Sequence, residues 1–360
     1  MRAVRPILIM AGGTGGHVFP ALAVADELRA RGVPVIWLGT QAGIEARLVP
    51  QAGYPIEWLG ISGWRGKGIV NTLLAPARLL VACYQALLVL LKRKPCAVLG
   101  MGGFASGPGG LMAWLLRKPL LIHEQNAVAG LTNRLLSIVA SEVMEAFPGA
   151  LGKNAHYVGN PVRKDIIDLP TPEKRLASHD GALRVLVIGG SLGAVRLNEL
   201  VPEAVSKIEP AARPEVWHQT GLKNHGDAQA LYEKFNVEAR VDAFVDDMAA
   251  AYAWADLVIC RAGAMTVFEL AAAGVASILV PYPHAVDDHQ TMNAEYLERV
   301  GAAIVRQQND MDAEWLKLTM IELMQHRDRI VSMAKSARSQ AKPNASNEVA
   351  ERCMLVGGLI

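Results

Sequence analysis

The chain has 360 residues, of which 51% are hydrophobic and 19% are charged, and its formal net charge is +2. This length suits two folded domains, and the apolar content excludes a disordered chain. The low net charge and an aromatic content of only 6% argue against a nucleic-acid-binding protein.

Short β-like runs alternate with helical stretches in both halves of the chain. In the first half we expect strands at 7–10, 33–38, 97–99 and 120–122 and a helix at 19–31. The proline-containing stretch 161–181 has no clear period and is expected to cross between domains. The pattern then restarts, with strands expected at 185–188, 215–218, 241–244, 257–259 and 277–280 and a last helix after Lys342. This alternation predicts an α/β protein with two successive doubly wound domains that face each other across a cleft.

The most apolar stretch, residues 79–91, is followed by Lys92, Arg93 and Lys94. It falls short of the ~18 residues that a spanning helix needs. Periodicity alone favours a core helix, and the alternative is an apolar face that touches lipid, with the basic cluster at the headgroups. The apolar run at 7–10 leads directly into a glycine loop, as a first strand does, so we do not expect a signal peptide.

The four cysteines, Cys83, Cys96, Cys260 and Cys353, lack the spacing of metal ligands. We expect buried thiols in a reducing compartment, and no obligatory metal or other cofactor. Asp246 and Asp247 are expected to cap a helix at 248–254 rather than to bind a metal.

The sequence AGGTGGH at 11–17 matches neither common phosphate-loop pattern. A G-x-G-x-x-G fingerprint that starts at Gly13 would end on Val18, and no stretch matches G-x4-G-K-[ST]. Glycines nevertheless let the backbone approach a ligand, and the helix that follows offers free N–H groups to an anion. A plain strand–helix turn with His17 as a cap is an equal alternative.

Further glycine-rich turns follow later strands, at 101–110 (MGGFASGPGG) and 189–194 (GGSLGA). We expect the first to extend the anion site of the N-terminal domain with backbone amides and the second to form an anion site in the C-terminal domain. Glu269, in an apolar stretch, needs polar partners, which are either ribose hydroxyls or a salt bridge with Arg261. The polar loop at 281–294 suits sugar hydroxyls, or it is a solvated loop in which Asp287 or Asp288 caps the next helix.

Eight stretches occur in the order found in one family: GGTGGHVFPALAVADEL, LGMGGFASGPGG, HEQN, GNPVR, GGSLGA, HQTG, the run 246–274 and the HQTMNA loop. The chain resembles the MurG family of N-acetylglucosaminyltransferases over nearly its whole length. The resemblance implies a GT-B fold, with lipid I bound by residues 1–161 plus about 343–360 and UDP-GlcNAc bound mainly by residues 162–342. It further implies a peripheral enzyme on the cytoplasmic side of the inner membrane, with a membrane-facing patch near 69–94 to which Trp114 is added. Other wall-synthesis proteins are expected as further partners.

The resemblance also implies which residues contact the donor: Thr14, Gly15, Gly16, Asn126, Arg163, Ser191, Val245, Ala264, Met265, Thr266, Val267, Phe268, Glu269 and Gln290. Glu269 would hold the ribose, Ser191 the diphosphate, and Asn126 and Gln290 the GlcNAc. His289 stands where some relatives carry glutamine.

The implied reaction moves GlcNAc from UDP to the C4 hydroxyl of the muramoyl sugar of lipid I with inversion, giving lipid II and UDP. It needs a base, and His17 is the first candidate because imidazole accepts protons near neutral pH. Glu124 is a weaker second candidate. The alternatives are another GT-B enzyme, such as a diacylglycerol glycosyltransferase or a UDP-GlcNAc 2-epimerase, a nicotinamide-dependent dehydrogenase, and a non-catalytic nucleotide-sugar-binding module.

Overall fold

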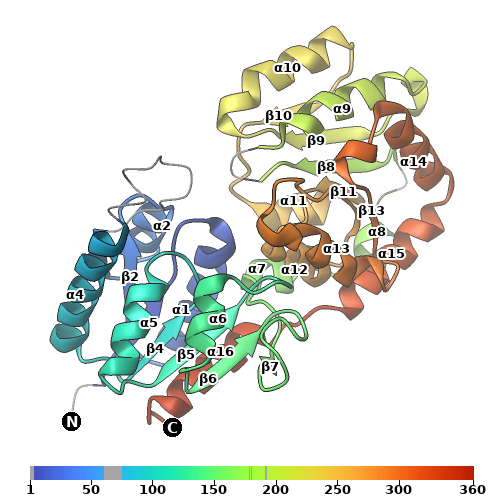
Figure 1. Cartoon of the computed structure of the whole chain (residues 1–360). Coiled ribbons are helices and arrows are strands. Elements are labelled where there is room, and N and C mark those ends of the chain that lie inside the picture. The colour runs from blue at the N-terminus through green and yellow to red at the C-terminus, as the bar shows by residue number, and fades with distance from the viewer. Residues whose placement is uncertain (1–3, 61–74, 178, 180, 191–192) are drawn as a thin grey trace. The chain divides into compact units, whose positions relative to one another are not determined.

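The computed structural model describes residues 4–60, 75–177, 179, 181–190 and 193–360 (Figure 1). The chain forms two compact units, Met1–Arg163 with Lys342–Ile360 and Lys164–Ala341. The predicted boundaries differ from these by one or two residues. Each unit is described by itself below.

The first unit is built on a parallel seven-stranded sheet in the order β3-β2-β1-β4-β5-β6-β7. Its strands are β1 (Ile7–Met10), β2 (Val35–Thr40), β3 (Ile56–Leu59), β4 (Ala97–Gly100), β5 (Leu120–Glu124), β6 (Glu142–Glu145) and β7 (His156–Tyr157). Its helices are α1 (Gly15–Ala30), α2 (Glu45–Gln51), α4 (Ala75–Arg93), α5 (Ser106–Leu115), α6 (Leu131–Ser137) and α16 (Ala345–Val356).

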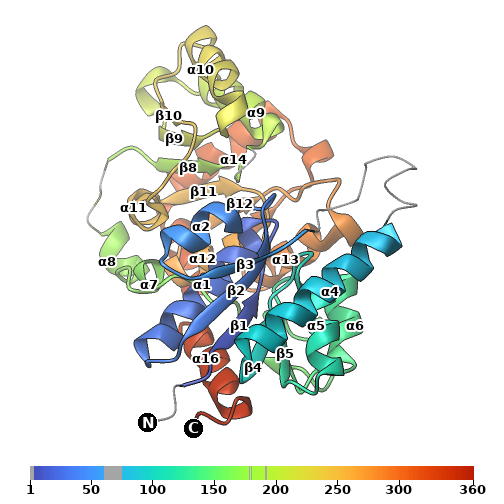
Figure 2. The same cartoon turned by 90° about the vertical axis from the view of Figure 1, so that its left-hand side faces the viewer.

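Both faces of this sheet are covered, as the side chains of β1 show. Ile7 and Ile9 belong to a core cluster that includes Val18 of α1 and Val349 of α16. Leu8 and Met10 point to the other face and join Ala82 of α4. A strand that is buried on both faces becomes a continuous apolar run, which is why β1 is readable from the sequence. The last helix α16 packs against α1 and β4 in the first unit, as both views show (Figures 1 and 2).

The second unit has a parallel six-stranded sheet in the order β10-β9-β8-β11-β12-β13. Its strands are β8 (Arg184–Ile188), β9 (Glu215–Gln219), β10 (Arg240–Asp242), β11 (Leu257–Cys260), β12 (Ala276–Leu279) and β13 (Ala303–Val305). Its helices are α7 (Lys164–Ile167), α8 (Pro172–Leu176), α9 (Val195–Ser206), α10 (His225–Lys234), α11 (Met248–Trp254), α12 (Ala264–Ala273), α13 (His289–Glu298), α14 (Ala313–Gln325) and α15 (Arg327–Ser339). The stretch 161–181 contains the boundary between the two units, after Arg163, and its two short helices α7 and α8 were not predicted.

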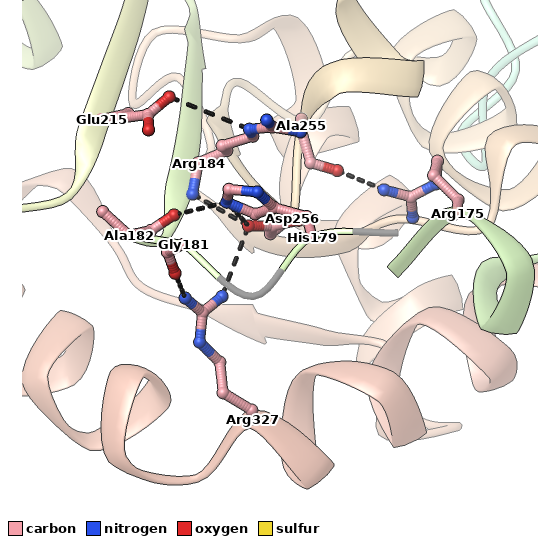
Figure 3. A network of polar contacts seen from close by, with 9 residues as sticks. All are labelled: Arg175, His179, Gly181, Ala182, Arg184, Glu215, Ala255, Asp256 and Arg327. Atoms are coloured by element: carbon pink, nitrogen blue, oxygen red, sulfur yellow. Dashed lines mark hydrogen bonds and ion pairs between the residues drawn. The ribbon is translucent and has the colours of Figure 1, made fainter. Parts of the chain in front are cut away.

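Buried polar groups around Asp256 tie α8, β8 and α15 of the second unit together (Figure 3). Asp256 accepts hydrogen bonds from the backbone N–H of Arg184 at 2.9 Å and from Nη1 of Arg327 at 3.3 Å. Beside it, Arg175 donates to the carbonyl oxygens of Ala255 and Gly274, and burial lowers its pKa to about 10. These bonds connect α8, near the start of the second unit, and the first residue of α15 to the residues directly before β11.

All four cysteines are buried and none forms a disulfide, which confirms the expected thiols. In the described part of the chain no group of three or more His, Cys, Asp and Glu side chains is arranged to hold a metal ion.

Candidate active site

The first glycine turn sits at the carboxyl end of β1 and opens directly into α1. Helix α1 begins at Gly15 rather than at residue 19, so Gly15 and Gly16 are its first two residues and Thr14 is the exposed N-cap. The N–H groups of a helix's first turn have no carbonyl partner within the helix, and the positive end of the helix dipole lies there. The three predicted residues Thr14, Gly15 and Gly16 therefore form one exposed helix terminus that suits an anion.

Glu45, which the sequence did not single out, lies beneath this turn. Its side chain is fully buried, and it accepts hydrogen bonds from the N–H of Gly13 at 2.9 Å and from the N–H and Oγ1 of Thr40 at 3.0 and 2.8 Å. A Cβ atom on Gly12 would lie 2.4 Å from Oε1 of Glu45. The carboxylate thus explains the glycine at position 12, and the N–H of Gly13 is not available to a ligand.

The imidazole of His17 is held between the first and the middle glycine turns. Its Nδ1 lies 2.9 Å from Oε1 of Gln125, which follows β5. A Cβ atom on Gly102 would lie 2.6 Å from the same Nδ1, and Gly102 has a φ of +94°. The middle turn therefore leaves room for the ring of His17.

Two later glycines of this segment serve packing, and the anion-binding role of its amides stays a prediction. Gly109 and Gly110 lie inside α5, where an added Cβ would meet Sδ of Met10 at 2.3 Å and Cδ1 of Leu136 at 2.7 Å. These glycines let α5 approach β1 and α6 closely.

The two candidate bases have different surroundings. Glu124 is buried, and its two carboxylate oxygens accept four hydrogen bonds, from the N–H and Nδ2 of Asn126, the N–H of Gly130 and Nδ2 of Asn133. A carboxylate held this way stabilises the loop that positions Asn126, so the geometry favours His17 as the base. Arg163, also in the first unit, places its guanidinium 5.2 Å from the ring centroid of Phe19 on α1.

In the second unit, the turn after β8 is shaped by close backbone contacts. Gly190 and Gly193 have φ values of +78° and +77°, and a Cβ on Gly193 would lie 2.0 Å from the carbonyl oxygen of Thr220. Helix α9 begins two residues later, at Val195. Ser191, the predicted diphosphate contact, lies outside the described residues.

Helix α12 carries the predicted run Ala264, Met265, Thr266, Val267, Phe268 and Glu269, so these residues share its first turns after the N-cap Gly263. Glu269 is 7% exposed, and its Oε2 accepts a hydrogen bond from the Tyr252 hydroxyl at 3.1 Å. The guanidinium of Arg261 donates instead to the carbonyl oxygens of Val280 and Pro281 and to Oε1 of Gln308. Arg261 therefore anchors the end of β12, and the alternative of a salt bridge between Arg261 and Glu269 loses its support.

Two of the polar loops of this unit are also fixed by hydrogen bonds. Gln290, at the start of α13, accepts a hydrogen bond from the N–H of Tyr282 at 2.9 Å. Asp288 occupies the N-cap position of α13 in a left-handed conformation but its side chain makes no capping bond. Asp247 does cap α11, accepting from the N–H of Ala250 at 2.8 Å, as predicted. Val245, two residues before it, is buried.

Helix α4 presents one face to the core and another to solvent. Ala82, Ala86 and Leu90 belong to the core, whereas the large apolar residues on the other side are exposed: Leu79, Leu80, Val81, Tyr84, Leu88 and Leu91. Its 19 residues make it long and apolar enough to span a membrane, by length and composition only, which corrects the prediction on length. Its buried residues pack in the same core cluster as residues of the sheet, so one side of the helix belongs to the first unit's core. Residues 69–74 of the predicted patch lie outside the described residues.

The basic cluster at the end of α4 is partly neutralised. Nζ of Lys92 and Nε of Arg93 lie 3.2 and 2.7 Å from Oε1 of Glu57. The two cations lower the pKa of Glu57 although its partial burial opposes this. Trp114 and Leu115 at the end of α5 add exposed apolar surface in the same unit.

The chain matches two family models, the glycosyltransferase family 28 N-terminal domain over residues 7–145 and the glycosyltransferase family 28 C-terminal domain over residues 184–349. A relative from Nitrosococcus oceani, named UDP-N-acetylglucosamine--N-acetylmuramyl-(pentapeptide) pyrophosphoryl-undecaprenol N-acetylglucosamine transferase, is 54% identical over 97% of this chain and 98% of its own length. A relative of the same name from Methylococcus capsulatus is 53% identical over 98% of this chain and 99% of its own.

Solved structures agree with these matches. The crystal structure of Acinetobacter baumannii MurG is 43% identical, with a TM-score of 0.84 over 98% of this chain and 99% of that one. A UDP-GlcNAc 2-epimerase from Neisseria meningitidis, 12% identical with a TM-score of 0.66 over 97% of this chain and 99% of that one, shares the fold alone. The predicted GT-B fold of two parallel-sheet α/β domains is confirmed. The chain belongs to the MurG family of N-acetylglucosaminyltransferases, within glycosyltransferase family 28.

Proposed function

We propose that the chain transfers GlcNAc from UDP-GlcNAc to the C4 hydroxyl of the muramoyl sugar of lipid I, giving lipid II and UDP. The observation that carries this proposal is the 54% identity, over nearly the full length of both chains, to a transferase named for these substrates. A fold likeness alone would not suffice, because an epimerase shares this fold.

The second unit is proposed to hold the donor. The N-termini of α9 and α12 supply free N–H groups for the diphosphate, and Glu269, held by Tyr252, supplies acceptors for the ribose hydroxyls. Val245 is assigned to the uracil, Gln290 to the GlcNAc and Ser191 to the diphosphate by the resemblance.

The first unit is proposed to hold lipid I, with its diphosphate at the N-terminus of α1. His17, the third residue of that helix, then lies one turn or less from the bound anion. In the reaction His17 accepts the proton of the C4 hydroxyl, the new O4–C1 bond forms, and the C1–O bond to UDP breaks with its electron pair leaving on the diphosphate. A single displacement of this kind inverts the configuration at C1. Asn126 and Arg163 are assigned to the donor by the resemblance.

We also propose that the enzyme is peripheral to the cytoplasmic face of the inner membrane. The exposed apolar face of α4, with Lys92, Arg93 and Lys94 at its C-terminal end, has the character of a surface that rests on lipid headgroups. No obligatory metal or other cofactor is part of the proposal.

Product analysis tests the transfer directly. The purified chain is incubated with UDP-GlcNAc and a soluble lipid I analogue, and the acceptor is examined by mass spectrometry and by the anomeric coupling in its NMR spectrum. A mass gain of one GlcNAc in a β linkage is expected. Free N-acetylmannosamine derivatives without a change in the acceptor would indicate the epimerase alternative.

A further inference from the structure

Three side chains and one carbonyl group form an unbroken chain of hydrogen bonds that ends on His17. Nδ1 of His17 lies 2.9 Å from Oε1 of Gln125, Nε2 of Gln125 lies 3.1 Å from Nδ1 of His123, and Nε2 of His123 lies 2.9 Å from the carbonyl oxygen of Gly159. All four residues belong to the first unit.

The donor and the acceptor of each hydrogen bond can be assigned by starting from the carbonyl oxygen of Gly159. A carbonyl oxygen only accepts, so Nε2 of His123 carries the proton. His123 is fully buried, and burial lowers its pKa to about 4, so the ring is neutral and its Nδ1 is an acceptor.

The amide of Gln125 is oriented by this acceptor. Its NH2 group donates to Nδ1 of His123 and also to the His123 carbonyl oxygen at 3.1 Å, so two acceptors fix the nitrogen on that side. Oε1 of Gln125 then faces Nδ1 of His17 as an acceptor, and Nδ1 of His17 must carry its proton. In the neutral ring the lone pair then lies on the remaining nitrogen, Nε2.

We propose that Gln125 and His123 are positioning residues that hold His17 as the Nδ1–H tautomer, so that Nε2 is the nitrogen that takes the acceptor's proton. This rests on the proposed function, in which His17 is the base. An imidazole free in water prefers the opposite tautomer, with the proton on Nε2, so the protein must impose this one. Gln125 and His123 are almost completely buried, as expected of groups that fix a side chain rather than touch substrate.

The tautomer is measured by 15N NMR on the full chain labelled in its histidines, with the signals of His17 assigned by their loss in His17→Gln. In the wild type, His17 should show a protonated Nδ1 and an unprotonated Nε2, and His123 the reverse. In Gln125→Leu, the His17 signals should shift toward the Nε2–H form. His123→Leu, which does not alter a residue in contact with His17, should cause a smaller shift because the His123 carbonyl still holds Gln125.

Kinetics complete the test. Gln125→Leu should lower kcat about tenfold or more while KM for UDP-GlcNAc stays within about twofold, since only the reacting nitrogen is affected. Asn133→Leu is the matched control for the tautomer. Asn133 is buried beside the same strand and also donates a hydrogen bond to the His123 carbonyl oxygen, but it does not belong to the chain of hydrogen bonds that ends on His17. The tautomer of His17 in this variant should therefore match that of the wild type.

Two results overturn the proposal: an unchanged His17 tautomer in Gln125→Leu, or a changed tautomer with wild-type kcat. Failure of the proposed function is distinguishable, because the wild type would then show no acceptor-dependent GlcNAc transfer, whatever the NMR spectra show.

Discussion

The carboxylate of Glu45 accepts a hydrogen bond from the N–H of Gly13 at 2.9 Å, across 32 positions of the chain. The buried carboxylate of Glu45 thus lies beneath the anion site proposed at the N-terminus of α1. All its described hydrogen bonds come from backbone N–H groups and one hydroxyl group. The carboxylate shapes the turn and withdraws one amide from the ligand.

Replacing this carboxylate should destabilise the first unit. In Glu45→Gln an NH2 group would face the N–H of Gly13 or of Thr40, so we expect the free energy of unfolding to fall by about 2 kcal/mol. Chemical denaturation followed by circular dichroism measures this. Glu351→Gln, an exposed position on α16, is the control and should change stability by less than about 0.5 kcal/mol. Equal effects at the two positions would mean that Glu45 does not hold the turn.

Glu269 should govern affinity for the ribose of the donor. Glu269→Gln is expected to weaken UDP binding about tenfold in calorimetry, because a hydrogen bond between a charged acceptor and a hydroxyl is lost. The same substitution should have little effect on binding of 2′,3′-dideoxy-UDP, which lacks the hydroxyls. Tyr252→Phe, which removes one hydrogen bond to the carboxylate but keeps the carboxylate, should weaken UDP binding less. A penalty of the same size for both nucleotides would assign Glu269 a purely structural role.

The outer face of α4 should decide membrane binding. Leu80 and Leu88 are 72% and 48% exposed, and burying part of each side chain in lipid contributes roughly 1 kcal/mol or more. Leu80→Ser with Leu88→Ser should therefore reduce sedimentation with vesicles that contain anionic lipid by about tenfold or more. Leu318→Ser on α14, which removes a leucine that is 55% exposed in the second unit, is the control. Undiminished binding of the α4 variant would refute the lipid-facing role.

Buried histidines should make the protein sensitive to acid. Burial lowers the pKa of His218 from 6.5 to about 3. Between these values the unfolded chain binds a proton that the folded chain does not, so the stability supplied by this group is present above pH 6.5 and is lost as the pH falls. From pH 6.5 to 4.5 the loss amounts to roughly 2–3 kcal/mol per histidine.

Denaturation across this pH range measures the loss. His218→Gln should lose less stability than the wild type over the same interval, although the wild type is the more stable protein at pH 7, where its hydrogen bond to Tyr232 is intact. The exposed His326→Gln should follow the wild-type curve. Parallel curves for His218→Gln and the wild type would show that His218 is not held neutral by the fold.

Strands that are buried on both faces were the easiest to predict from the sequence. Strands β1, β8 and β11 are continuous apolar runs and were predicted to within a residue or two. Strands β3 and β6 were missed because they carry glutamates and are only partly buried, so neither alternation nor an apolar run marks them. Helix α1 was predicted to begin four residues late, because glycines in a first turn resemble a loop.

Site residues could be predicted from the sequence where they stand together along the chain. They could not be predicted where their role depends on contacts between residues far apart in the sequence. The glycine turn and His17 stand together in the sequence, but Gln125 lies 108 positions from His17 and acquires its orientation from the burial of His123. The period of two that places His123 and Gln125 on the same side of the chain at the end of β5 was the available signal. Glu45 offered no such signal, since a glutamate at the start of a helix is commonly exposed and here is completely buried.

The most direct test of the account is UDP release from UDP-GlcNAc by the purified chain, measured with and without a lipid I analogue. We predict release that depends on the analogue, is stoichiometric with a product one GlcNAc heavier, and falls at least a hundredfold in His17→Ala. Release at the same rate without acceptor, or binding of UDP-GlcNAc with no release when the acceptor is present, would contradict it.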